Sequence, residues 1–112
     1  MKRFYRLRRN RDFQQVRRTG KYYASSLVVL AFLQNELNYS RFGFVVSKRA
    51  GNAVHRNKTK RRMREVIRQF IPRIKPGFDL VFVARQPIRQ ANYSQIQQSL
   101  IHLLKKADLL LD

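Results

Sequence analysis

Residues 48–68 read KRAGNAVHRNKTKRRMREVIR, a segment with nine lysines and arginines, one histidine and a single acid, Glu65. Asn52 is a favourable N-cap residue and Pro72 would end a helix, so the sequence predicts a helix from Asn52 to about Phe70. Its apolar positions form one stripe at helical spacing: Met63, Val66, Ile67 and Phe70. One face of this helix therefore suits a protein core.

The basic residues of the same helix gather beside that stripe. At about 100° per residue, the basic face contains Asn57, Lys60, Arg61, Arg64 and Arg68. Like charges three or four residues apart destabilise a helix, and solvated helices normally mix both signs. We therefore predict that this face binds phosphate groups, with which arginine forms paired hydrogen bonds. The alternatives are a purely solvated face and a helix lying on a membrane surface.

The composition indicates one basic globular domain, residues 1–112, with a polyanionic partner. The net charge is +19, while 44% of the residues are hydrophobic and 13 are Phe or Tyr. Such a charge opposes folding by self-repulsion, and a bound RNA, DNA, anionic membrane or acidic protein would offset it. The absence of cysteine excludes disulfides and fits a cytoplasmic protein. No apolar run is long enough to predict a membrane span.

Local patterns predict the other elements. Residues 1–9 form a basic, extended arm, and a short helix over 11–19 is capped by Asn10 and stopped by a left-handed Gly20. Further along the chain the sequence predicts strands over 22–34, 41–47 and 78–84 and a last helix over 93–107. The short connection between the first two strands predicts that they pair as an antiparallel hairpin.

These elements, in the order αββαβα, predict a two-layer α+β sandwich. Residues 42–47, the basic helix and residues 78–84 can form a parallel crossover unit. Such units are right-handed by default.

The basic helix suits RNA better than DNA. A helix that reads a DNA major groove needs base-reading side chains and usually a helix-turn-helix or dimer frame, and the sequence shows neither. Proteins recognise double-helical RNA mostly by shape and phosphate contacts. A ladder of arginine and lysine with few base readers therefore favours RNA.

The sequence predicts no catalytic residue and no metal site. Its two histidines, His55 and His102, have no obvious spaced partner, and the six acids are scattered without a DxD or HxxxH pattern. Acid–base or metal-assisted hydrolysis would need such a group.

Several segments together resemble the bacterial ribonuclease P protein component. The central one is GNAVHRNKTKRRMRE at 51–65, which resembles the family's RNR basic helix at Arg56, Asn57, Lys60, Arg61 and Arg64. The others lie in register along the chain: LRRNRDFQQV at 7–16, SRFGFVVSKR at 40–49, GFDLVFVARQP at 77–87 and SLIHLLKKA at 99–107. The resemblance implies a mixed sheet of about four strands and a left-handed βαβ crossover.

The resemblance also implies a function. Members of the family are protein subunits of an enzyme whose catalytic RNA uses magnesium ions (Mg²⁺) to cut the 5′ leader from precursor tRNA. The resemblance implies one protein per RNA. The residues expected to bind the catalytic RNA are Arg56, Asn57, Lys58, Lys60, Arg61, Arg64 and Arg68.

The precursor-tRNA leader is expected in a cleft between the first helix and the sheet. The residues expected there are Arg11, Phe13, Arg17, Lys48 and Arg49, and the arm residues Arg6, Arg8 and Arg9 are expected to contact RNA. Some relatives have aromatic residues where this chain has Arg17 and Ala31, which favours charge contacts over stacking here. The alternatives are that Phe13 belongs to the core, that the chain is a ribosomal protein, and that it is a protein-only nuclease.

Overall fold

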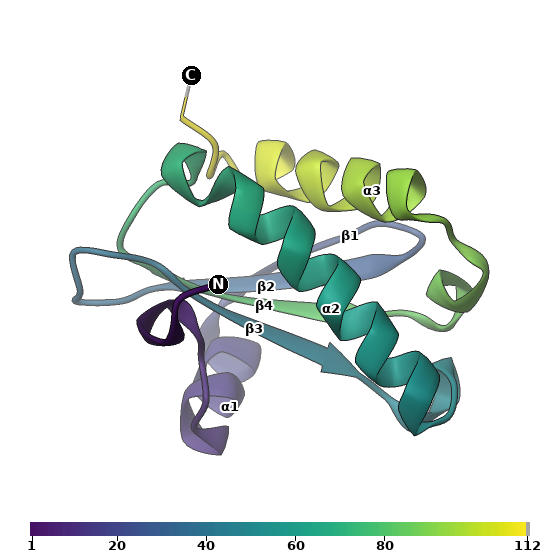
Figure 1. Cartoon of the computed structure of the whole chain (residues 1–112). Coiled ribbons are helices and arrows are strands. Elements are labelled where there is room, and N and C mark those ends of the chain that lie inside the picture. Colours follow the sequence, from purple (N-terminus) through teal and green to yellow (C-terminus); the bar gives the residue numbers. More distant parts are fainter. Residues whose placement is uncertain (112) are drawn as a thin grey trace.

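The computed structural model describes residues 1–111, which form one sheet with helices on both of its faces (Figure 1). The main elements are α1 (Asn10–Thr19), β1 (Lys21–Ala24), β2 (Val28–Gln34), β3 (Arg41–Val46), α2 (Ala53–Phe70), β4 (Phe78–Ala84) and α3 (Tyr93–Lys106). Short 3₁₀ helices precede or connect them: η1 (Arg3–Tyr5), η2 (Lys48–Ala50), η3 (Ile71–Arg73) and η4 (Gln86–Gln90).

The four strands form a mixed sheet in the order β1-β2-β4-β3. The pairs β1–β2 and β2–β4 are antiparallel, and β3–β4 is parallel. Helix α2 connects the two parallel strands, and with α2 in front of the sheet the chain crosses from β3 to β4 in the left-handed sense (Figure 1). The mixed α+β fold is confirmed, and the right-handed default is wrong for this crossover.

Two predictions about the strands are wrong. The single strand expected over 22–34 is a hairpin, β1 and β2, whose turn is stabilised by the Ser25 hydroxyl as it accepts a hydrogen bond from the Val28 amide at 3.1 Å. The expected pairing of β2 with β3 does not occur, because β4 lies between them. Strand β4 is apolar on both faces and therefore takes a central place.

The two faces of the sheet carry separate clusters of buried side chains. The α2–α3 layer packs on the face that includes Phe42, Leu80 and Phe82, which are at most 1% exposed. The predicted stripes of α2 and α3 supply Met63, Val66, Ile67, Ile96, Leu100, Leu103 and Leu104 to this core. Helix α1 covers part of the opposite face, where its Val16 packs with Ala31 and Val81. Strands β2 and β4 are thus covered on both sides.

The helix ends differ in how well local rules describe them. The Asn52 side chain accepts a hydrogen bond from the His55 amide at 3.0 Å, which confirms the predicted cap of α2. At α1 the cap residue is Arg9, not Asn10, and Gly20 has φ −77°, so the predicted left-handed stop is wrong. Gly20 is required for another reason, since a Cβ there would overlap the carbonyl oxygens of Val16 and Phe32.

The basic arm is packed against the sheet instead of being extended along its whole length. Its first turn is η1, and the Leu7 amide then donates a hydrogen bond to the Phe42 carbonyl at 2.9 Å. Arg6 forms a parallel bridge with Phe42, and Leu7 is 5% exposed. The arm therefore adds one short pairing to the free edge of β3.

Candidate nucleic-acid interface

A groove of about 330 Å³ runs between α1, the second half of β3 and α2. Its lining combines aromatic, cationic and amide side chains with apolar strand residues: Asn10, Phe13, Gln14, Arg17, Phe44, Val45, Val46 and Lys60. The prediction placed Phe13 and Arg17 together, and the structure does so. The prediction missed Phe44, because the alternation of side chains along β3 indicates only that Phe44 faces the core.

Phe13 is both a core residue and a groove residue. Its ring lies so close to Gly43 that a Cβ at that position would overlap two of its ring carbons. The side chain also packs on the cluster around Val16 and Val81, and it is only partly buried. The ring is thereby packed on the strand and on the cluster, while one part of it lines the groove.

Two basic residues of α2, Lys60 and Arg64, lie on the groove side of that helix. Lys60 lines the groove, and the Arg64 guanidinium lies 5.8 Å from the centre of the Phe44 ring. Burial, with repulsion from Arg6 as a second cause, lowers the pKa of Arg64. In the described part of the chain its Nε is buried without a hydrogen-bond partner. An anion close to Arg64 and Arg6 would offset the repulsion between them and favour the charged form of Arg64.

Apart from Arg68 and the two residues on the groove side, the other α2 residues expected to bind the catalytic RNA are either exposed or hydrogen-bonded within the protein. Asn57, Lys58 and Arg61 are exposed to solvent. Arg56 donates a hydrogen bond to the Gly51 carbonyl at 3.2 Å. These residues leave a cationic surface along the first two-thirds of the helix.

Arg68 differs from the other basic residues of α2, because it is paired with the only acid of that helix. Its Nε and Nη2 donate to the two carboxylate oxygens of Glu65 at 3.0 and 2.7 Å. These hydrogen bonds lower the pKa of Glu65 to about 2. The pair is exposed, so it contributes little to folding, but it neutralises part of the charge that Arg68 could offer a ligand.

The other residues expected near the leader lie at different places. Lys48 and Arg49 are exposed in η2, directly after the end of β3 that lines the groove. Arg11 does not line this groove but a second hollow, on the other side of the first turn of α1. Ala31 is fully buried beneath α1.

This second hollow, of about 540 Å³, is formed mainly by the arm. Six arginines line it together with two aromatic residues and one acid: Arg3, Phe4, Arg6, Arg8, Arg9, Arg11, Asp12, Tyr39 and Arg41. The predicted arm contacts Arg6, Arg8 and Arg9 are thus brought together. Tyr39 and Arg41 were missed, because no local pattern connects them with an arm more than thirty residues away.

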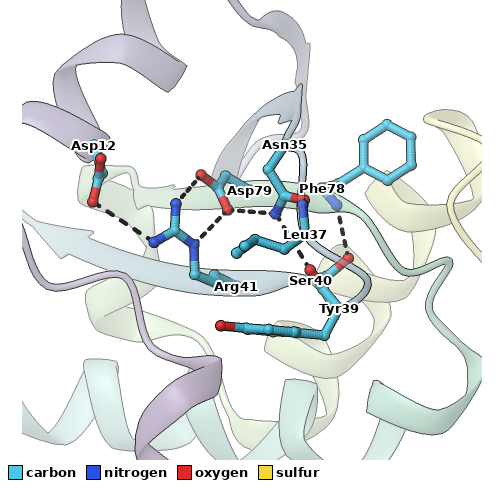
Figure 2. Close-up of polar contacts among 8 residues, drawn as sticks. All are labelled: Asp12, Asn35, Leu37, Tyr39, Ser40, Arg41, Phe78 and Asp79. Carbon is cyan, nitrogen blue, oxygen red and sulfur yellow. Dashed lines mark hydrogen bonds and ion pairs between the residues drawn. The ribbon is translucent and has the colours of Figure 1, made fainter.

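Arg41 is the arginine of this hollow whose side chain is held by hydrogen bonds to the sheet (Figure 2). Its Nε and Nη2 donate to the two carboxylate oxygens of Asp79 at 2.9 and 2.7 Å, which raises the pKa of Arg41. Asp79 is 7% exposed and also accepts a hydrogen bond from the Asn35 side chain at 2.9 Å. Arg41 Nη1 lies 3.8 Å from the Asp12 carboxylate, so one guanidinium links α1 to the sheet.

Neither histidine lies in the groove or in the hollow of the arm. His55 Nδ1 is 3.1 Å from the Asn52 side-chain oxygen at the start of α2, and His102 lines a separate pocket beside Ser25 and Ser99. Among residues 1–111, no three His, Cys, Asp or Glu side chains are grouped so that they could hold a metal ion. No helix in the same part of the chain has the length and apolar character to cross a membrane.

Comparison with known proteins gives one consistent result. The sequence model of the family described as Ribonuclease P matches residues 1–108. The ribonuclease P protein component of Alkaliphilus oremlandii is 40% identical over 110 residues, which cover 98% of this chain and 96% of that protein. That of Roseiflexus castenholzii is 43% identical over 108 residues, covering 96% and 88%.

Solved structures agree with the sequence comparison. The RNase P protein of Staphylococcus aureus has a TM-score of 0.89 and 39% identity, covering 95% of this chain and 97% of that chain. For the RNase P protein of Thermotoga maritima the TM-score is 0.83 and the identity 35%, covering 90% and 96%. The similarity therefore extends along nearly the whole chain in both sequence and fold.

Proposed function

This chain belongs to the ribonuclease P protein family, which implies a part in tRNA 5′ processing, and from this premise we propose how it acts. It binds the catalytic RNA of the enzyme and the 5′ leader of precursor tRNA, and the RNA carries out the cleavage. The observation that carries the proposal is the position of the groove, which has aromatic and cationic walls and adjoins the cationic face of α2.

The catalytic RNA binds the basic helix. Exposed Asn57 and Arg61, with Lys60 and Arg64 at the groove side, provide donors for several phosphates along one face, and exposed Lys58 adds a charge outside that face. Arg56 and Arg68 take part more weakly, because each already has a partner within the protein. A long row of cations with few base readers fits recognition by phosphate and shape.

The leader occupies the groove as a single strand. Phe13 and Phe44 offer ring surface for a base, and Arg17 and Lys60 offer positive charge for the phosphates on either side. Stacking combined with a cationic groove is the usual way to hold a single strand without strict sequence preference. Lys48 and Arg49 extend the positive charge beyond the end of β3.

The chemistry belongs to the RNA. Magnesium ions held by the RNA would supply the activated water for the cleavage, and the protein raises the affinity for the substrate. We propose one protein per RNA, acting in the cytoplasm. The scattered acids and the two isolated histidines support this division of labour, since a protein-only nuclease would need a convergent acid–base or metal-binding group.

The decisive experiment measures precursor-tRNA cleavage at low, near-physiological magnesium with the catalytic RNA alone, the protein alone, and both. We expect efficient cleavage only with both. Cleavage by the RNA-free protein would support the protein-only nuclease. No cleavage in any mixture, combined with tight binding to ribosomal RNA, would support a ribosomal protein instead.

A further inference from the structure

We propose that the arginine-lined hollow of the arm is a second site for single-stranded RNA, in which one base stacks on Phe4 and its phosphates bind the surrounding arginines. The inference deepens the proposed function and rests on it. It assigns a ligand to a hollow that is separate from the groove around Phe13.

Phe4 is an aromatic ring that is exposed but held in place. It is 50% exposed, although it is one of the largest apolar side chains of the arm. Its ring centre lies 4.3 Å from that of Tyr5 and 5.3 Å from that of Tyr39, with which it makes an edge-to-face contact. Tyr5 in turn lies 6.5 Å from Phe42 of the core. A base stacked on the free face of Phe4 would cover apolar surface without any rearrangement of the ring.

The backbone turn that carries Phe4 is also closed by hydrogen bonds within the protein. The turn of η1 is closed by hydrogen bonds from the Tyr5 amide to the Lys2 carbonyl and from the Arg6 amide to the Arg3 carbonyl, both 3.1 Å long. Leu7 then anchors the arm to β3. A ring on an ordered turn loses less conformational entropy on binding than one on a free tail.

The charge of the hollow favours the binding of an anion. Arg3, Arg8 and Arg9 are exposed around it. The two acids nearby do not neutralise them, because Asp79 is buried under Arg41 and Asp12 also faces Arg41. Arginines in such a cluster repel one another, and phosphates can bind several of them in pairs of hydrogen bonds.

The hollow lies where a strand leaving the groove would pass. The first turn of α1 separates the two, since Asn10 lines the groove and Arg11 lines the hollow. Along β3, Phe44 belongs to the groove and Arg41 to the hollow, about 10 Å apart at the rise of a strand. An extended single strand can therefore contact both, which makes the part of the leader beyond the groove the favoured source. A single-stranded segment of the catalytic RNA is the other source of the same chemistry.

The test compares Phe4→Leu, which removes the ring but keeps apolar volume, with Phe4→Tyr, which keeps the ring. The affinity of the assembled holoenzyme is measured for precursor tRNA with a short leader that ends within the groove and with a leader extended by several nucleotides. We expect Phe4→Leu to weaken binding of the extended leader about tenfold, with little effect on the short leader. Phe4→Tyr should bind both like the wild type.

A second pair of variants tests the charges independently of the ring. Arg3→Gln/Arg8→Gln should reduce the salt dependence of binding to the extended leader by about one phosphate per residue. The control, Lys105→Gln/Lys106→Gln, removes two exposed charges from the end of α3 and should leave it unchanged.

The outcomes distinguish the leader from the catalytic RNA as the source of the bound strand. They also distinguish a failure of this inference from a failure of the proposed function. A loss confined to the extended leader identifies the leader as the ligand, whereas an equal loss in binding to the catalytic RNA alone identifies that RNA. Wild-type behaviour of both Phe4→Leu and the double arginine variant in all these assays would overturn the inference. It would leave the proposed function standing, provided that the wild-type protein still stimulates cleavage by its RNA.

Discussion

The Phe13 ring lies directly against the backbone of Gly43, at a place where a side chain on residue 43 would overlap it. This contact connects α1 to the edge strand β3. It also fixes the position of the Phe13 ring that lines the groove. Glycine at 43 is thus explained by the close approach of a ring, and the contact connects the packing of the core with the groove proposed to bind RNA.

Gly43→Ala should push the Phe13 ring out of position. We expect a loss of about 1–3 kcal/mol in the free energy of unfolding, typical of overpacking a tight contact, measured by urea titration. In a Phe13→Ala background most of this cost should disappear, because the clashing ring is gone. An equal cost in both backgrounds would show that the ring is not what Gly43 accommodates.

Phe13→Ala should weaken binding of the leader and spare assembly with the catalytic RNA. We expect a loss of about 1–3 kcal/mol in leader affinity, measured as the difference between precursor and mature tRNA binding to the holoenzyme. If the wild-type holoenzyme bound long- and short-leader substrates equally well, the groove would not be the leader site.

Lys60→Ala and Arg64→Ala should each reduce the salt dependence of binding to the catalytic RNA by about one phosphate contact. Arg68→Ala should have a smaller effect, because its guanidinium is already paired with Glu65. The measurement is the slope of log affinity against log salt concentration. Unchanged slopes for both Lys60→Ala and Arg64→Ala would place the RNA elsewhere.

The Glu65 carboxyl should titrate near pH 2, well below its ordinary value of 4.5, because Arg68 and Gln69 donate hydrogen bonds to it. Since the folded pKa is the lower one, its stabilising effect is present above about pH 4.5 and is lost as the pH falls toward 2. Arg68→Gln should return the pKa toward 4.5, as followed by NMR. A pKa that does not move would mean that the pair does not persist in solution.

Asp79→Asn should destabilise the protein more than Arg68→Gln, although each removes one bidentate ion pair. Asp79 is buried beneath Arg41, so the loss leaves a partly buried guanidinium without its counter-charge and should cost about 1–3 kcal/mol. The Arg68–Glu65 pair is exposed to solvent, which screens it, so its loss should change the free energy of unfolding much less. Urea titration of both variants tests the ranking, and equal costs would contradict it.

The sequence by itself determined the elements that are stabilised by residues close together in the chain. The helix from Ala53 to Phe70 follows from the Asn52 cap, the apolar stripe and the proline that comes after it. The alternation in β3 and β4 likewise determined which of their side chains enter the core. The placing of Phe13 and Arg17 in one groove came from the family resemblance together with their shared helix.

Only the tertiary structure decided what depends on partners far apart in the chain. The order of the strands puts β4 between β2 and β3, and no local pattern encodes that neighbour. Arg41 and Asp79 meet across 38 positions, and Asp12 of α1 lies 3.8 Å from the same guanidinium. The arm is held to β3 by the hydrogen bond from Leu7 to Phe42. The arginine-lined hollow exists only after these long-range contacts form, since packing and hydrogen bonding between distant segments bring its residues together, whereas periodicity acts only within one segment.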